Sequence, residues 1–228
     1  MIVDDVARIL GIAVQLLGIL VWPVVLVILA ARFHEPITDF LKNISQFNVK
    51  ALGVEASVTT KQREQAVAAL GAAVVAKHGG ANDGSAEAAD FKAIAEAMPT
   101  PAVLQRLQRS RVLWVDDNPG SNHFERQALD ALGIWVEIST STADALARTK
   151  VVSYDLIISD MTREPDPQAG YTLLGELRER GDRTPFVIYA GSSSPQLTAE
   201  ARARGAIDYL NEPAELVGLI TTLLGTKP

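Results

Sequence analysis

The C-terminal half of the sequence predicts an α/β fold in which a doubly wound parallel sheet is covered by helices on both faces. From Arg111 onward, apolar strand-like runs alternate with amphipathic helix-like segments, and the alternation gives five strand and helix pairs. Ser194 followed by Pro195 is a typical helix start, with a capping hydroxyl and a proline in the first turn. The predicted strands are 111–116, 134–139, 154–160, 185–191 and 206–210, and the predicted helices are 124–133, 143–150, 171–181, 198–205 and 214–225.

The N-terminal part predicts a single transmembrane helix. Residues 9–31 contain Gln15 as their one clearly polar side chain, and as a helix they would span roughly 34 Å, enough for a bilayer core of about 30 Å. A cleaved secretory signal is the competing interpretation, but Asp4 and Asp5 occupy the place of its basic region. Lysine and arginine are more frequent after the span than before it, which predicts a cytoplasmic C-terminal part.

The middle of the chain is predicted to connect the anchor to the α/β domain. Residues 48–60 have the valine content of extended structure, and Thr59 with Gln62 is spaced like a capping box that opens a helix. Its apolar stripe suits local packing or pairing with a second copy as a homodimer, and both stay open. Residues 78–90 are small, polar and glycine-rich, typical of a flexible linker. Residues 91–98 favour a helix that Pro99 and Pro101 stop, and 102–110 lead into the C-terminal part. The predicted divisions are an anchor (1–32), a juxtamembrane segment and helix (33–77), a linker and connecting helix (78–110) and the α/β domain (111–228).

Composition narrows the chemistry available to the chain. Its 228 residues have a formal net charge of -6, which disfavours nucleic acid as a partner. The absence of cysteine removes disulfides, thiolate metal sites and cysteine nucleophiles.

Three carboxylates lie at the carboxyl ends of predicted strands. In doubly wound folds, this is the edge of the sheet at which ligands bind. Asp116 and Asp117 end the first strand, and Asp160 ends the third. Negative groups brought to one point call for a hard cation, and oxygen-only ligation with room for waters favours Mg²⁺. A carboxylate beside such a cation is also a candidate nucleophile toward a phosphoryl group.

In these motifs the sequence resembles the receiver domains of response regulators in two-component signalling, over about residues 111–226. The resemblance rests on VDDNP (115–119), LIISDM (156–161) and GAIDYLNEP (205–213), in that order. It implies a flavodoxin-like fold in which Asp116 and Asp117 organise Mg²⁺ and Asp160 accepts the phosphoryl group. It also implies a further metal ligand in the backbone carbonyl of Thr162 and a switch residue in Tyr209.

Two positions depart from the family pattern. Ala190 replaces the hydroxyl that bonds the phosphoryl group in the family, and Glu212 replaces the lysine that pairs with it. Ser192 and Arg163 are nearby candidates to substitute, although a serine in a turn and a solvated loop arginine are the ordinary alternatives.

The sequence therefore predicts a membrane-anchored receiver-like module of a phosphorelay, located at the cell membrane with its receiver-like domain in the cytoplasm. Mg²⁺-assisted phosphorylation of Asp160 by a sensor kinase or another phosphodonor would change its interactions with a partner protein. Beyond self-phosphorylation and dephosphorylation at Asp160, the resemblance implies no enzyme. The alternative is a pseudo-receiver that acts as a phosphorylation-independent binding scaffold. A hydrolase using Ser192 with His123 is a third class, but GSSSP lacks the G-x-S-x-G turn.

Overall fold

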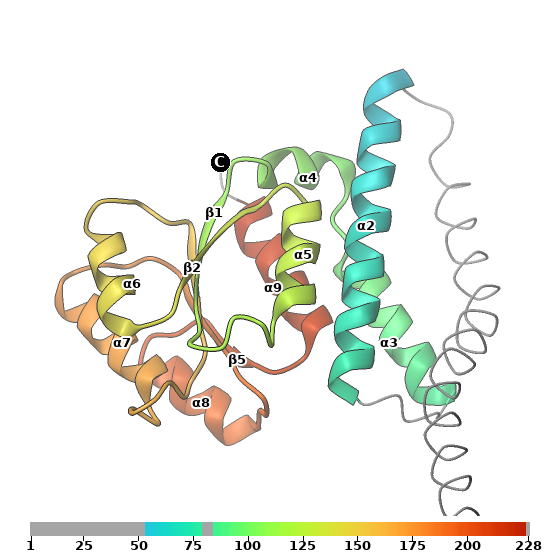
Figure 1. The fold of residues 1–228 in the computed structure, drawn as a ribbon. Coiled ribbons are helices and arrows are strands. Elements are labelled where there is room, and N and C mark those ends of the chain that lie inside the picture. The colour runs from blue at the N-terminus through green and yellow to red at the C-terminus, as the bar shows by residue number, and fades with distance from the viewer. Residues whose placement is uncertain (1–52, 79–83, 227–228) are drawn as a thin grey trace, which may run out of the picture. The chain divides into compact units, whose positions relative to one another are not determined.

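The computed structural model describes residues 53–78 and 84–226, and its central feature is a five-stranded parallel sheet (Figure 1). The strand order is β2-β1-β3-β4-β5, so the order reverses direction between β1 and β3. This is the doubly wound order of flavodoxin-like folds, and the predicted fold class is confirmed. The strands are β1 (Arg111–Val115), β2 (Trp135–Ser139), β3 (Leu156–Ser159), β4 (Phe186–Tyr189) and β5 (Asp208–Leu210).

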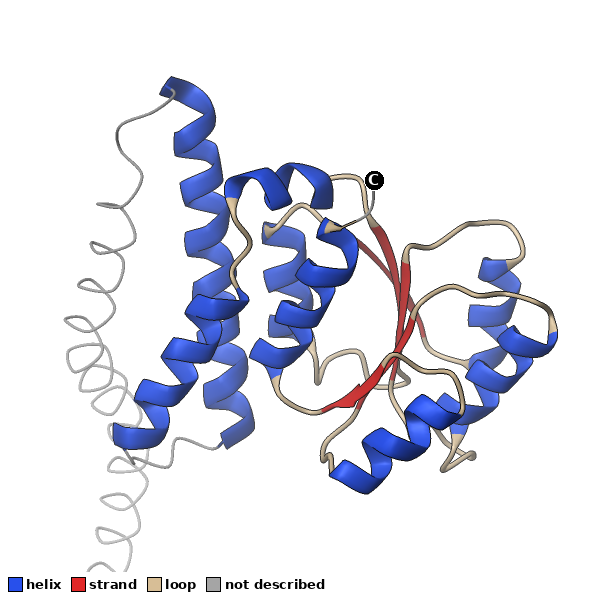
Figure 2. Ribbon diagram, turned by 180° about the vertical axis from the view of Figure 1, so that it is seen from behind, coloured by secondary structure: helices blue, strands red, loops and turns tan. Residues whose placement is uncertain are grey.

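Helices cover both faces of the sheet, as Figure 2 shows from behind. Helices α5 and α9 lie on one face, and α6, α7 and α8 lie on the other. Ser141 and Ser194 cap α6 and α8 by accepting a hydrogen bond from a backbone N–H of the first turn, which confirms the helix start predicted at Ser194. The helices are α5 (His123–Ala131), α6 (Thr142–Thr149), α7 (Ala169–Glu179), α8 (Pro195–Ala203) and α9 (Pro213–Gly225).

The core lies between the sheet and its helices. Leu113, Ile157 and Phe186 from the strands pack with Leu174 of α7 in one cluster of buried side chains. On β1 the alternate residue Trp114 contacts Tyr189 of β4 edge to face, with ring centroids 5.9 Å apart. Successive strand residues face opposite sides, so the near-continuous apolar sequence of β1 is explained by helices on both faces.

In the described part of the chain, three further helices precede the sheet: α2 (Gly53–His78), α3 (Gly84–Ala97) and α4 (Pro101–Leu107). The described residues from Ser57 onward form one compact unit. Helices α3 and α4 pack on α9, where Arg106 donates a hydrogen bond to the Gly225 carbonyl at 2.9 Å. The outer face of α9 is therefore buried, which accounts for its strongly apolar sequence.

Two local predictions from the sequence are wrong in this region. Residues 53–60 belong to α2, so this part of the predicted extended segment is helical, and the helix begins at Gly53 instead of opening at the capping box of Thr59. Helix α3 begins at Gly84, within the segment predicted as a flexible linker through Asp90. The apolar stripe of α2 (Val67, Leu70 and Val74) is buried. Helices α2 and α3 thus extend through segments that contain valine and glycine, whose weak helix propensity is a small term that the rest of a long helix can outweigh.

The predicted membrane span at 9–31 lies outside the described residues. Among the helices that the structure describes, none has both the length and the apolar character needed to cross a bilayer.

Candidate functional site

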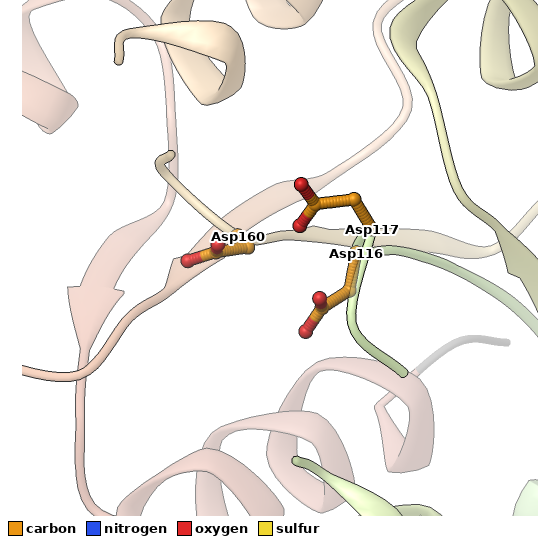
Figure 3. Close-up of side chains that lie close together, drawn as sticks. All are labelled: Asp116, Asp117 and Asp160. Carbon is orange, nitrogen blue, oxygen red and sulfur yellow. The ribbon is translucent and has the colours of Figure 1, made fainter. Parts of the chain in front are cut away.

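Three acidic side chains meet where the strand order reverses. Val115 of β1 pairs in register with Ser159 of β3, which places the next residues, Asp116 and Asp160, side by side at the carboxyl edge of the sheet. Asp117 joins them, and carboxylate oxygens of the three residues lie within 4.8 Å of one another (Figure 3). The topology thus gathers the three predicted carboxylates at the position where flavodoxin-like folds bind ligands.

Asp116 is the most enclosed of the three and is held through both of its oxygens. Its Oδ1 accepts a hydrogen bond from the backbone N–H of Asn118 at 2.7 Å, which closes a local turn. Its Oδ2 accepts a hydrogen bond from the side-chain amide of Asn122. Asn122 is the N-cap residue of α5 but makes no side-chain cap bond, so its amide serves the site instead of the helix.

Asp117 and Asp160 are held less tightly. Asp160 Oδ1 accepts a hydrogen bond from the backbone N–H of Met161 at 2.7 Å, and Asp117 Oδ2 accepts one from the backbone N–H of Glu164 at 3.2 Å. Within the described part of the chain, Oδ2 of Asp160 accepts no hydrogen bond. The acceptor predicted from the sequence therefore has one carboxylate oxygen available for chemistry.

Arg163 lies buried beside these carboxylates and is 3% exposed. Its guanidinium donates hydrogen bonds to Ser159 Oγ at 2.6 Å, to the Asp160 carbonyl at 2.7 Å and to the Ala169 carbonyl at 2.8 Å. A further bond reaches Thr142 Oγ1 at 3.1 Å. Arg163 is thus an internal strut of the acceptor loop, and the interpretation of this residue as a solvated loop charge is wrong.

The electrostatics of the site favour an added cation. Burial raises the pKa of Asp116 and of Asp160, the mutual repulsion of the carboxylates raises both further, and Arg163 opposes the rise. Burial lowers the pKa of Arg163, while the three carboxylates counteract this shift. Clustered carboxylate oxygens destabilised by burial and by one another fit Mg²⁺, which prefers oxygen ligands.

A cavity of about 370 Å³ opens above the carboxylates. One wall contains Tyr189, whose hydroxyl donates a hydrogen bond to Glu125 Oε1 at 2.9 Å. Both side chains are buried, and burial together with the adjacent Glu125 raises the pKa of Tyr189. Ala190 also lines this wall, so a methyl group occupies the place where the family has a hydroxyl. Asp116, Asp117, Asp160, Ala73, Ala76, Lys77, Asn118, Ser121, Asn122, Phe124, Gly191 and Asn211 complete the lining.

Glu212 lies at the N-terminus of α9 and is paired with the end of α2. Its Oε1 is 3.2 Å from Lys77 Nζ, and its Oε2 is 3.4 Å from His78 Nε2. The other ring nitrogen of His78 is 3.5 Å from Asp90 of α3. The anion that replaces the family lysine is thus covered by basic side chains from a preceding helix.

The remaining predicted residues lie in varied surroundings. Thr162 follows the acceptor and is exposed, with its hydroxyl 3.3 Å from the Pro167 carbonyl. Tyr209 is 5% exposed and packs in the core. Ser192 and His123 are exposed and do not line the cavity, which leaves the hydrolase hypothesis without support from the described residues. The roles assigned to Thr162 and Tyr209 stay predictions.

Sequence reasoning missed four residues that shape the site: Asn122, Glu125, Tyr189 and Lys77. Glu125 and Tyr189 are 64 positions apart and meet through the tertiary fold. A polar residue in the first turn after Asp-Asp-Asn was a signal for Asn122. No local pattern in the sequence singles out Lys77, because its approach depends on how α2 packs.

These features define a receiver-type α/β domain with an acidic pocket. Residues 112–224 match the family model described as the response regulator receiver domain. This part of the chain is a response regulator receiver domain, a family that takes part in two-component signalling, interacts with phosphodonor sensor kinases and binds Mg²⁺ at an acidic pocket.

Curated relatives share the same region. The transcriptional regulatory protein TrcR of Mycobacterium tuberculosis is 30% identical over 135 residues, which are 56% of this chain and 52% of the relative. The acid tolerance regulatory protein ActR of Rhizobium meliloti is 28% identical over 118 residues, which are 50% of this chain and 57% of the relative. The chain thus spans about half the length of these relatives. The predicted lack of a nucleic-acid partner stays a prediction.

Solved structures are similar over the same half of the chain. A Francisella response regulator receiver domain is 24% identical with a TM-score of 0.46, and the match covers 51% of this chain and 97% of that one. The response regulator TrrA from Thermotoga maritima, solved in complex with Mg²⁺-BeF, is 21% identical with a TM-score of 0.44 and covers 50% of this chain and 98% of that one.

Proposed function

We propose that this chain is a receiver module of a phosphorelay in which Asp160 accepts a phosphoryl group. The observation that carries the proposal is the gathering of Asp116, Asp117 and Asp160 within 4.8 Å at the switch point of the sheet. An available Oδ2 on Asp160 and a cavity above it supply the nucleophile and the space for a phosphodonor.

In the proposed reaction, an Asp160 carboxylate oxygen forms a bond to the phosphorus of the donor. The bond between phosphorus and the donor's leaving group breaks, and the electron pair departs with that group. Mg²⁺ held by Asp116, Asp117 and the backbone carbonyl of Thr162 would offset the negative charge of the carboxylates and the phosphoryl oxygens. Hydrogen bonds from Asn118 and Asn122 orient Asp116, while the bond from Met161 orients Asp160.

Phosphorylation adds charge next to a loop that Arg163 and Asp117 hold, and we propose that the resulting rearrangement is read by a partner protein. The phosphodonor would be a sensor kinase or another phosphorylated protein.

The alternative function is a pseudo-receiver that binds its partner without phosphoryl chemistry. Ala190 and Glu212 favour this alternative, because the usual hydroxyl and lysine are missing from their family positions.

Incubation of the full chain with acetyl phosphate and Mg²⁺ separates the two functions. Intact mass measurement is expected to show one added phosphoryl group, and EDTA or Asp160→Asn should remove it. Asp130→Asn, at an exposed position on α5, is the matched control and should leave the adduct in place. A wild-type chain that remains unmodified, or an adduct that persists in Asp160→Asn, would sink the phosphorelay proposal.

Metal binding provides an independent test of the acidic pocket. Asp116→Asn is expected to weaken Mg²⁺ binding by about 100-fold or more, since outer-shell changes alone typically cost 10- to 100-fold. Titration calorimetry of the wild-type and variant chains measures this change. Equal Mg²⁺ affinity in both chains would show that the cation binds elsewhere.

We also propose that residues 9–31 anchor the chain in the cell membrane with the receiver domain in the cytoplasm. Support comes from the apolar run and from the lysine and arginine bias after it. After a carbonate wash, the full chain is expected to remain in the membrane fraction. A variant without residues 9–31 is expected in the supernatant. Recovery of both in the supernatant would refute the anchor.

A further inference from the structure

Helix α2 brings a basic side chain to the cavity above the phosphoacceptor. Lys77, in the last turn of α2, lines the same cavity as Asp116, Asp117 and Asp160. Figures 1 and 2 show α2 on the side of the domain that carries α5 and α9. The buried positions Ala66, Leu70 and Ala73 lie on one side of this helix, so packing fixes its C-terminal turn near the cavity.

The environment of Lys77 is unusual for a lysine. Its side chain is 22% exposed, its Nζ is shielded from solvent, and no described acceptor forms a hydrogen bond of good geometry with that nitrogen. Its described charge partner is Glu212, 3.2 Å away. An ammonium group has three donors, so one ion pair leaves it able to bind further oxygen atoms.

Glu212 occupies the position where the resemblance places a lysine that pairs with the phosphoryl group. A carboxylate there repels an incoming phosphoryl group, yet its pairing with Lys77 brings a cation to the same place. The positive charge that the family carries at this position is thus present, but Lys77, 135 positions earlier in the chain, carries it. The carboxylate of Glu212 holds that charge in place.

We propose that Lys77 is the phosphoryl-binding cation of this receiver, held by Glu212 until Asp160 is phosphorylated. The phosphoryl oxygens then compete with Glu212 for the Lys77 ammonium, because a dianionic phosphate forms stronger charge-assisted hydrogen bonds than one carboxylate. Breaking the ion pair loosens the link between α2 and the start of α9. This inference rests on the proposed phosphorylation of Asp160 and names the residue that reads it.

Labelling of the full chain with acetyl phosphate and Mg²⁺ tests the inference. Lys77→Gln keeps most of the side-chain length and is expected to lower the labelling rate by about 10- to 100-fold, the loss of one charge-assisted hydrogen bond. Glu212→Gln frees Lys77 and should raise the rate by about 3-fold. Lys92→Gln is the matched control, since Lys92 is 77% exposed on α3, and should leave the rate unchanged.

A charge exchange tests whether labelling needs a cation at the Lys77–Glu212 pair, and the comparison of labelling with stability shows whether the pair acts only through folding. Lys77→Glu alone should abolish labelling, and Lys77→Glu combined with Glu212→Lys should restore most of it, because a lysine then lies at the family position. Thermal unfolding and circular dichroism of each variant show whether it is folded. If Lys77→Glu fails to fold, the labelling rates of Lys77→Gln and Glu212→Gln still decide whether Lys77 binds the phosphoryl group.

A second readout follows the ion pair without relying on the rate of labelling. The chain has no cysteine, so Val75→Cys at an exposed position of α2 and Gln196→Cys at an exposed position of α8 provide two unique spin-label sites. Addition of Mg²⁺ with beryllium fluoride, a phosphoryl mimic, is expected to broaden or shift the distance distribution between the labels. The same addition should have no effect in the Lys77→Gln background.

The outcomes distinguish this inference from the proposed function. If the wild-type chain is labelled and Lys77→Gln is labelled equally fast, Lys77 does not bind the phosphoryl group and the inference is overturned, while the phosphorelay function survives. If the wild-type chain is neither labelled nor altered by beryllium fluoride, the proposed function fails and the inference fails with it.

Discussion

The two halves of the sheet's carboxyl edge are built in different ways. In the β1–β3 half, which holds Asp116, Asp117 and Asp160, each carboxylate is fixed by a backbone N–H within a few residues or in the adjoining loop. In the β4–β5 half, which holds Ala190 and Glu212, the side chains expected to bind a phosphoryl group are absent. The charge near Glu212 comes instead from α2.

This difference separates what strand geometry determines from what side chains determine. Strand register and tight turns position the carboxylates, so the acidic cluster follows from the fold itself. Binding of a phosphoryl group needs a hydroxyl or a cation at a suitable height above the cluster, and such groups can be supplied by any element that packs there. The β1–β3 half is therefore expected to be the more sensitive to substitution.

Arg163→Met should have the largest effect on stability. It removes a buried cation that bonds to Ser159, the Asp160 carbonyl and the Ala169 carbonyl, and it leaves the acidic cluster without its internal counter-charge. We expect the free energy of unfolding to fall by about 3 to 5 kcal/mol, as when one partner of a buried charge pair is removed. Urea unfolding monitored by circular dichroism measures this change.

The matched control for Arg163→Met is Arg180→Met. Arg180 is exposed at the C-cap of α7 and pairs with Glu176 one helical turn earlier, and its loss should cost less than about 1 kcal/mol. A similar loss of stability in both variants would show that the buried arginine is not the strut of the β1–β3 half.

Tyr189→Phe tests the β4–β5 half of the cavity wall. The variant leaves the buried Glu125 without the hydroxyl that donates to its Oε1, and the free energy of unfolding should fall by about 1 to 3 kcal/mol. Glu125→Met combined with Tyr189→Phe should recover most of this loss, because replacing both partners with apolar groups leaves no unsatisfied acceptor. Urea unfolding measures these changes. A double variant that is no more stable than Tyr189→Phe would contradict this explanation.

Gly170→Ala probes the close approach of α7 to the acceptor strand. A Cβ at this position would lie 2.9 Å from the Asp160 carbonyl oxygen, a backbone atom that cannot rotate away. We expect a loss of about 1 to 3 kcal/mol in the free energy of unfolding, together with slower labelling by acetyl phosphate. Gly175→Ala on the same helix has open space around it and should instead gain about 0.5 to 1 kcal/mol.

Local sequence patterns predicted most of the fold but less of the site. The five apolar runs and the serine caps depend on neighbouring residues, so strands, most helices and the convergence of Asp116 with Asp160 could be predicted. The burial of Arg163 could not be predicted, because it depends on which segments close over a loop. The position of Lys77 beside the cavity could not be predicted for the same reason, because the packing of α2 determines which residues Lys77 contacts.

The errors in the preceding segment have a related cause. Residues 53–60 were predicted to be extended from their valines, and Gly84–Asp90 was predicted to be a linker from its small residues. Such propensities amount to less than about 1 kcal/mol per residue, so they yield when a helix is long and one face of it is buried. The same packing places α2 beside the cavity.

The smallest expected effect concerns the acceptor itself in the metal-free chain. Burial and the neighbouring Asp116 and Asp117 raise the pKa of Asp160, so the folded chain binds this proton more tightly than the unfolded chain does. Stability from this group is therefore present below the unfolded pKa of about 3.9 and is lost as pH rises through the folded pKa. Asp160→Asn removes the charge that causes this loss.

In EDTA at neutral pH, Asp160→Asn should therefore raise the unfolding temperature by about 2 to 4 °C relative to wild type. The advantage should vanish toward pH 4 and below, where the wild-type carboxylate is protonated in both states. Saturating Mg²⁺ should reverse the order, because a ligand that prefers the carboxylate stabilises the wild-type chain more. Thermal scans at several pH values measure this, with Asp130→Asn as the exposed control. A wild-type chain that gains stability over Asp160→Asn as pH rises in EDTA would show that Arg163, rather than repulsion, dominates the β1–β3 half.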